Sequence, residues 1–378
     1  MEQSTALFSH FAQVEDPRVD RTKRYPLIEI IFLVISATIS GSEGWKAVRD
    51  FGQLKLNWLR KFLPYKEGIP VDDTIARVMR KIDTKQFRDC FVNWMRSVST
   101  LTNGDIIAID GKTLRGSYDN SSNKSAIHMV SAWSTANSMV LGQEKTSEKS
   151  NEITAIPELL KTLELKGCIV SIDAMGCQTK IATDIVKKGA DYILALKGNQ
   201  GILHDDVKGF FAKAIDSDFK DIEHDFHTEY DAGHGRVETR SCWVLDPFPH
   251  KNCFSNLERW DKLKRVMMVK SRREFKDKIT EDTRVYITSC ILGAQDLLNA
   301  VRKHWQVENT LHWTLDVTFN EDASRIRKES SPENYAMIRH IDINILRGYK
   351  SIKASVKRKL NMAALDDDFR TKLITQVI

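Results

Sequence analysis

The stretch Asp105–Ser117, DIIAIDGKTLRGS, sets an apolar run directly against a carboxylate and a glycine. The four residues before Asp110 are apolar and mostly β-branched, which favours a buried strand. The pattern returns 63 residues later in CIVSID, which ends on Asp173. We therefore predict two central strands that deliver an aspartate at the same relative position, each followed by a turn away from the sheet.

The segments around these two strands alternate between short β-branched runs and helical patterns. This order predicts an α/β fold, an α+β mixed sheet with helices packed on its faces. We expect strands over 126–133, 138–145 and 191–199, the first two antiparallel to the strand at Asp110, and helices over 151–165 and 178–189.

Changes in the spacing of apolar residues and in charge divide the chain into three parts. Residues 1–98 have apolar positions at three- and four-residue steps, which predicts an all-helical domain. Residues 99–346 would hold the mixed sheet, with a β-rich insertion of charged strands at about 205–290. Residues 347–378 form a basic helical tail with 8 Lys and Arg against 3 Asp and Glu.

Composition limits the function classes without choosing one. The chain is 42% hydrophobic and 29% charged, as in a globular protein, and its net charge of +6 is compatible with a polyanionic partner. The longest apolar run, Ile30–Ile39, is too short for a bilayer, which needs about 20 residues. Without a secretory pattern at residues 1–13, we expect a cytoplasmic protein. The six cysteines lack the paired spacing of a zinc site.

Two carboxylates at the ends of neighbouring strands would lie close together. Like charges at that separation repel strongly unless a cation lies between them, and oxygen ligands favour Mg²⁺ or Mn²⁺. Asp110 and Asp173 are therefore candidate metal ligands. The alternative is that each aspartate only caps a turn.

A third carboxylate is predicted on the long helix that begins near Ala294. One face of that helix carries a stripe at steps of four and three residues, Val301, Trp305, Glu308, His312 and Leu315. A glutamate in an apolar stripe is costly unless it is paired or metal-bound, so Glu308 is expected to face the sheet. Two alternatives remain: a solvent-facing Glu308, and a transition-metal face of His304, Glu308 and His312, whose outer ligands lie about 12 Å apart.

Two strand-end aspartates and a helix glutamate around a pair of Mg²⁺ ions suit phosphodiester chemistry. Several cations near them are candidate DNA ligands, although each could equally be a plain surface cation. Lys112 and Arg115 follow Asp110 directly, and Lys197 lies near the end of the strand expected over 191–199. In the insertion, Arg236 and Arg240 share a strand face that could follow a phosphate backbone or simply be solvated. The helical segment at 70–95 suits either a helix-turn-helix-like DNA module or a helical cap.

Motifs spread along nearly the whole chain resemble the DDE-type insertion-sequence transposases, and most closely the H-repeat-associated transposase-like proteins. The motifs are, in order, DPRV, GIPVDDTIARV, IAIDGKTLRGS, EKSNEITAIPELL, IDAMGCQ, LALKGNQG, HGRVETR, HWQVENTLHWTLDVTFNED and IRHIDINIL. The resemblance implies an RNase H-like core with a catalytic and metal-binding triad of Asp110, Asp173 and Glu308. It also implies two Mg²⁺ ions, for which Mn²⁺ can substitute, and cut-and-join chemistry on double-stranded DNA. A homodimer on the element's inverted-repeat ends and a nucleoid location would follow, with the N-terminal helices as a DNA-end-binding module.

The catalytic helix departs from the pattern of the wider superfamily. Relatives carry a tyrosine, arginine, glutamate and lysine signature, and of these only Glu308 is present here. The phosphate contacts that the signature supplies elsewhere would have to come from Arg302, His304, His312 or Arg325. Two other activities remain open: a structure-selective nuclease or recombination factor with the same fold, and a catalytically silent DNA-binding repressor.

Overall fold

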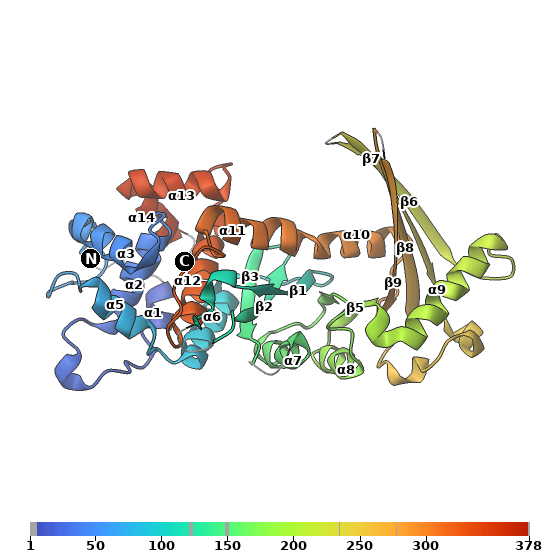
Figure 1. Ribbon diagram of the computed structural model, residues 1–378, viewed down its shortest axis with the longest axis horizontal. Coiled ribbons are helices and arrows are strands. Elements are labelled where there is room, and N and C mark those ends of the chain that lie inside the picture. Colours follow the sequence, from blue (N-terminus) through green and yellow to red (C-terminus); the bar gives the residue numbers. More distant parts are fainter. Residues whose placement is uncertain (1–5, 121–123, 148–150, 234, 277, 377–378) are drawn as a thin grey trace.

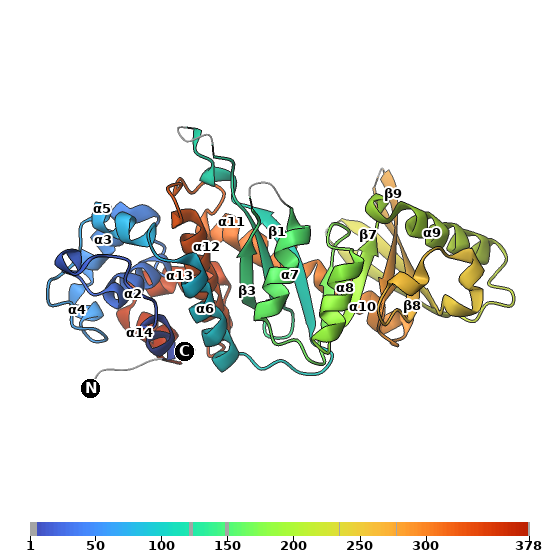
Figure 2. The same cartoon turned by 90° about the horizontal axis from the view of Figure 1, so that it is seen from below.

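The computed structural model describes residues 6–120, 124–147, 151–233, 235–276 and 278–376. The molecule is elongated, with a helical body at one end, a mixed sheet in the middle and a long-stranded extension at the other end (Figure 1). The same order is seen after a quarter turn in Figure 2. The first and last helices of the chain lie together in the helical body.

Five strands form the central part of the sheet, in the order β3-β2-β1-β4-β5. The strands β1, β2 and β3 pair antiparallel, whereas β4 and β5 run parallel to β1. This arrangement confirms the expected mixed α/β, RNase H-like fold. The strands are β1 (Ile106–Thr113), β2 (His128–Ser134), β3 (Met139–Lys145), β4 (Ile169–Ile172) and β5 (Asp191–Leu196).

Helices cover both faces of the central strands. The helices α7 (Glu152–Thr162) and α8 (Thr179–Lys187) pack on one face, below the sheet in Figure 1. The helix α10 (Ala294–His304) crosses the other face and is followed by a π-helical turn at Val307–His312 and by α11 (Trp313–Phe319). Side chains of α10 pack against Ile106 of β1 and Ile169 of β4 in one apolar cluster, so that face of the sheet lies under α10.

The expected insertion does contain four long strands, and they extend the same sheet past β5 in the order β9-β8-β7-β6. It opens with a helix, α9 (Gly201–Asp216), which the strand-based expectation for 205–290 missed. Short 3-10 turns at Phe248–Cys253 and Leu257–Arg259 connect its inner strands. The strands are β6 (Asp225–Gly233), β7 (Arg236–Leu245), β8 (Arg265–Phe275) and β9 (Lys278–Thr288).

The described residues before β1 contain helices and no strands. Nearly every side chain of α2 is buried, which explains the apolar run at Ile30–Ile39 without a membrane. None of the helices in the described ranges combines the length and apolarity of a bilayer crossing. The helices are α1 (Ala6–Phe11), α2 (Leu27–Thr38), α3 (Gly44–Leu54), α4 (Leu56–Leu59), α5 (Asp72–Met79) and α6 (Thr84–Val98), with a 3-10 turn at Asp20–Thr22.

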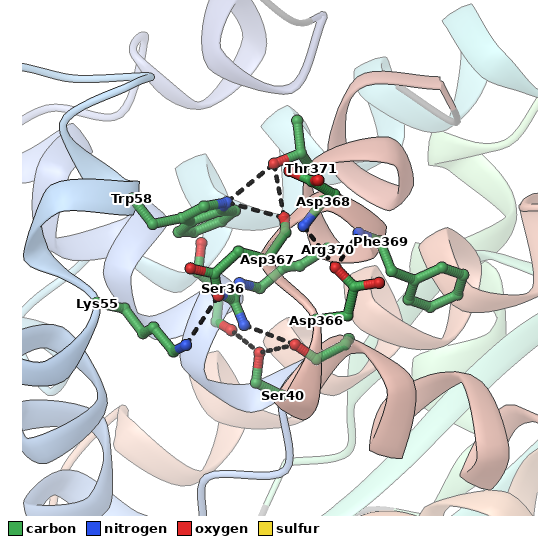
Figure 3. A network of polar contacts seen from close by, with 11 residues as sticks. Ser36, Ser40, Lys55, Trp58, Asp366, Asp367, Asp368, Phe369, Arg370 and Thr371 are labelled. Atoms are coloured by element: carbon green, nitrogen blue, oxygen red, sulfur yellow. Dashed lines mark hydrogen bonds and ion pairs between the residues drawn. The ribbon is translucent and has the colours of Figure 1, made fainter.

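The last helices, α12 (Ser331–Gly348), α13 (Val356–Leu365) and α14 (Asp367–Gln376), pack onto this helical body. Arg370 is fully buried, with its guanidinium carbon 4.2 Å from the centre of the Trp58 ring, and it donates to the carbonyl of Ala363 at 2.6 Å. The indole of Trp58 in turn donates to the Asp367 carbonyl and to the Thr371 hydroxyl (Figure 3). These contacts fix the basic tail to the N-terminal helices.

Candidate active site

Asp110 and Asp173 occupy equivalent positions on neighbouring strands. The parallel register of β1 and β4 pairs Ile109 with Ile172, so each aspartate is the next residue along. Because side chains alternate along a strand, Asp110 shares a face with Ile106, which packs under α10. The same alternation places Asp173 in line with Ile169, so we infer that both carboxylates face the α10 side of the sheet.

The strand β1 does not end at Asp110, contrary to the expectation of a sharp turn at Gly111. It continues through Thr113, and Gly111 pairs with Val130 of β2. What the glycine provides is space, because a β-carbon there would lie 2.1 Å from Oε1 of Glu152 and 2.3 Å from Nε2 of His128. The absence of a side chain at position 111 therefore lets the carboxylate of Glu152 approach β1 from the α7 face, opposite to the face that Asp110 shares with Ile106.

Glu308 lies in the π-helical turn at Val307–His312 and not in a regular α-helix. Its side chain is exposed, and the buried stripe of this region runs beside it through Val301, Val307 and Leu311. The expectation that Glu308 occupies an apolar stripe is therefore wrong. A π-helical turn contains more residues than an α-helical turn, so the side chains on one face no longer follow the spacing of a regular α-helix. Such turns are frequent at functional sites.

The carboxylates of the site influence one another's pKa values. Burial raises the pKa of Asp110 to about 7, and the carboxylates of Glu152, Asp173 and Glu308 raise it as well, against a backbone hydrogen bond from Gly111. Burial is also the main cause that raises the pKa of Asp173, followed by the charge of Glu152. Backbone hydrogen bonds from the turn after Asp173 and the charge of Lys197 act in the opposite direction. The neighbouring carboxylates therefore oppose the ionisation of Asp110 and of Asp173.

This donor set fits a hard divalent cation by its chemistry. Carboxylate oxygens whose mutual repulsion raises their pKa gain most from a bound cation, which replaces the proton they otherwise retain. Among the described residues, no three His, Cys, Asp or Glu side chains are gathered tightly enough to hold an ion as they stand. Holding one would require side-chain adjustment at Asp110, Asp173 and Glu308.

Two histidines on the α10–α11 segment border the site. Nδ1 of His312 lies 3.6 Å from Oδ2 of Asp110, and burial together with nearby Lys112, His128 and His304 lowers the pKa of His312 to about 4. His312 is thus neutral at pH 7. His304 is buried, and burial likewise lowers its pKa to about 4.

Glu152, the first residue of α7, is the acidic residue that the sequence analysis passed over. It is buried, and its Oε1 lies 2.8 Å from Nε2 of His128. The stretch EKSNEITAI contained the residue, but a glutamate at a helix start is common, and Asn151 caps the helix by accepting a hydrogen bond from the amide of Ile153. Only the fold brings its charge close enough to raise the pKa of Asp110 and of Asp173.

The cations that follow Asp110 are held by carboxylates. Nζ of Lys112 lies 2.7 Å from Asp316, 3.4 Å from Glu321 and 3.0 Å from Asp322, and its side chain is only 10% exposed. Lys112 is therefore an internal ion-pair partner in this arrangement and is not placed to grip a phosphate. Arg115 is exposed and lies 3.4 Å from Asp322.

The arginines of the insertion and Arg302 of α10 also form ion pairs with carboxylates. Arg236 lies 3.7 Å from Glu238, and Arg302 of α10 lies 2.8 Å from Glu229. Arg240 is bound between Glu229 and Glu238. Such pairing reduces the local positive charge that these arginines were expected to offer to DNA.

Lys197 has a different environment. It is exposed at the end of β5 and lines a pocket of about 460 Å³ together with Asp173, His304 and Trp305. Its charge lowers the pKa of Asp173. Of the basic residues predicted from the sequence, Lys197 is thus the one that combines exposure with a direct electrostatic effect on a candidate catalytic carboxylate.

Comparison with known proteins gives matches along nearly the whole chain. Residues 102–345 match the model of the transposase DDE domain, and residues 8–95 match that of the DDE_Tnp_1-associated domain. The "H repeat-associated putative transposase YhhI" of Escherichia coli strain K12 is 44% identical over 97% of each chain. The "Putative transposase YncI" of Escherichia coli O157:H7 is 45% identical over 96% of this chain and 92% of that protein.

A solved piggyBac transposase synaptic complex with hairpin DNA aligns over 97% of this chain and 77% of that chain. Its TM-score of 0.45 at 13% identity is too low to support any inference about this chain. The domain match and the near-complete relatives, in contrast, cover the strands that carry Asp110 and Asp173. The chain belongs to the family of transposases with a DDE domain.

Proposed function

We propose that this protein cleaves DNA at the ends of a mobile element and joins those ends to target DNA, in a reaction that depends on divalent cations. The observation that carries the proposal is the in-register placement of Asp110 and Asp173 on one sheet face, with Glu308 near enough to raise the pKa of Asp110. The overlap of this placement with the matched DDE domain supports the assignment.

In the proposed site, Asp110, Asp173 and Glu308 hold two Mg²⁺ ions, for which Mn²⁺ can substitute. Bound there, the ions would activate the attacking oxygen and stabilise the leaving oxygen of an in-line displacement at phosphorus. Water is the attacking group in the first step, which frees a 3′-hydroxyl at the element end. That hydroxyl is the attacking group in the second step, which exchanges one phosphodiester bond for another in the target.

The residues around the triad would orient the DNA and limit the charge of the site. Lys197 is proposed to contact a phosphate next to the scissile bond, because it is exposed at the edge of the Asp173 pocket. His312 is neutral and its Nδ1 lies 3.6 Å from Oδ2 of Asp110, so it borders that carboxylate without adding charge. Arg115, Arg236 and Arg302 remain proposed DNA contacts that would have to exchange a carboxylate partner for a phosphate.

The partners follow from the same chemistry. The protein is proposed to bind the inverted-repeat ends of its element as a homodimer, so that two ends are held together, and then to bind target duplex. The helices of residues 1–98 are proposed to form an associated domain that binds the element end. Its place of action would be the cytoplasm, at the DNA of the nucleoid.

The test uses duplexes cut from the DNA that flanks the gene. Wild-type protein is expected to nick them in Mg²⁺ and not in chelator, and Asp173→Asn is expected to lose that activity. Equal nicking by both proteins would refute the assigned carboxylates. A second assay with pre-cut ends separates the activities: joining to a target plasmid supports transposition, and cleavage without joining indicates a nuclease of the same family.

A further inference from the structure

A basic groove lies beside the helical segment that follows Glu308. It has a volume of about 680 Å³ and is formed between the segment Asn309–Thr318 and the chain that links α12 to α13. Asn309 and Thr310, the two residues that follow Glu308, are part of its wall. The groove therefore begins next to the proposed active site, and α13 lies beside α11 in Figure 1.

The charge of this groove is positive and unbalanced. Three exposed lysines, Lys350, Lys353 and Lys357, line it, and within the described residues none of them forms an ion pair and no carboxylate lines the groove. Lys112 and Arg302, in contrast, both form ion pairs with carboxylates. Free cations without nearby acids are what a phosphate backbone requires of a binding surface.

The floor of the groove is fixed in place by two other cations. The buried Lys359 donates to the carbonyls of Leu346 at 2.8 Å and Tyr349 at 2.6 Å, which ties the start of α13 to the end of α12. Arg347 donates to the carbonyl of Thr310 at 3.1 Å, which joins α12 to the π-helical turn. Further along, the buried Arg370 locks α14 to the N-terminal helices (Figure 3). The exposed lysines thus project from a supported backbone, and binding need not order a free tail.

The wall of the groove adds an aromatic surface. Trp313, the first residue of α11, lines the groove with 57% of its surface exposed. A flat aromatic ring among cations is the kind of surface against which the bases of a nucleic acid stack. Trp313 lies five residues from Glu308, so it would touch DNA near the proposed reacting phosphodiester.

We propose that this groove binds the phosphate backbone of the duplex whose end is cleaved, with Lys350, Lys353 and Lys357 as its phosphate contacts. The inference rests on the proposed function, since it assumes a DNA substrate at Glu308.

The experiment measures affinity for a fluorescent duplex from the DNA flanking the gene, at several salt concentrations. The variant is Lys350→Gln/Lys353→Gln/Lys357→Gln. Its matched control is Lys208→Gln/Lys213→Gln/Lys220→Gln, which removes the same charge from exposed lysines on and just after α9. Three lost phosphate contacts should reduce the slope of log affinity against log salt by about 2 to 3 and weaken binding at each salt concentration. The control should keep the wild-type slope.

The outcomes separate this inference from the proposed function. If wild-type protein binds the duplex and the groove variant binds with the same affinity and slope, the groove assignment is overturned and the proposed function stands. An equal loss in both triple variants also overturns it, because net charge alone would then explain the effect. If wild-type protein has no affinity for DNA, both proposals fail. A second readout is the quenching of tryptophan fluorescence by the duplex, which Trp313→Phe should reduce.

Discussion

Nε2 of His128 lies 2.8 Å from Oε1 of Glu152, and these two atoms occupy the space that a β-carbon on Gly111 would enter. The pair comes from β2 and from the first turn of α7, and it lies over the strand that carries Asp110. The missing side chain at Gly111 is thus a condition for the close approach of Glu152 to the strand that carries Asp110.

Gly111→Ala should displace the side chains of His128 and Glu152 while the protein still folds. The added methyl group would meet Glu152 at 2.1 Å and His128 at 2.3 Å, so both side chains must move, at a cost of about 1–3 kcal/mol in free energy of unfolding. Urea unfolding measures that cost, and DNA nicking should fall further than the stability loss explains. Gly209→Ala in α9 is the control, since its methyl group meets no atom within 4 Å and should stabilise the helix by up to about 1 kcal/mol. Wild-type stability and nicking in Gly111→Ala would contradict the packing described here.

Glu152→Gln should shift the pH dependence of DNA cleavage. The charge of Glu152 raises the pKa of both Asp110 and Asp173, so its removal lowers both values and lets the carboxylates ionise at lower pH. We expect the rising limb of the rate profile to move to lower pH in the variant. Glu158→Gln on the same helix is the control, because Glu158 is exposed and pairs with Lys161. An unmoved profile with an unchanged rate would show that Glu152 does not act on the site.

Asp110→Asn should stabilise the metal-free protein, and more so at high pH. The folded-state pKa of Asp110 is about 7 against an ordinary 3.8, so the stability it contributes is present at low pH and is lost as the pH rises to about 7. Asparagine cannot ionise and avoids that loss, which amounts to at most about 4 kcal/mol above pH 7. Urea unfolding in chelator at pH 5 and pH 8 measures the difference, with Asp216→Asn as the exposed control. A variant that is less stable than wild type at pH 8 would be inconsistent with the buried, repelled carboxylate.

Lys112→Met should reduce stability and leave the phosphate contacts of DNA unchanged. Its removal leaves Asp316, Glu321 and Asp322 without their shared cation, and breaking a buried ion pair costs about 3–5 kcal/mol. Thermal unfolding measures the loss, with Lys180→Met on the exposed face of α8 as the control. The salt dependence of DNA binding at a temperature where the variant is folded should match wild type. A shallower salt slope would instead restore Lys112 as a phosphate ligand.

The sequence was sufficient for the parts of the site that depend on local pattern. Two β-branched runs that each lead into an aspartate predicted β1 and β4, and the structure pairs Ile109 with Ile172, which aligns Asp110 with Asp173. Each run is buried on both faces, so the apolar residues identify the strand without knowledge of its neighbours.

The remaining features depend on contacts between distant segments. Lys112 donates a hydrogen bond to Asp322, which lies 210 residues further along the chain. No local sequence pattern predicts that the charge of a lysine after a strand will be paired with so distant a carboxylate. The continuation of β1 past Asp110 depends on its pairing with β2, and the π-helical turn at Glu308 shifts the helix face that a regular repeat predicts. Tertiary packing overrides the local signal in each case.

The central claim is that Asp110, Asp173 and Glu308 jointly hold divalent cations, and titration of the metal-free protein with Mn²⁺, followed by electron paramagnetic resonance of the free ion, tests it without DNA. Wild-type protein should remove free Mn²⁺ from solution with saturable affinity that strengthens as the pH rises toward 7, because Asp110 must release its proton. Asp110→Asn, Asp173→Asn and Glu308→Gln should each weaken that binding, whereas Glu158→Gln should not. A protein with all three carboxylates replaced that still bound Mn²⁺ as wild type does would contradict the account.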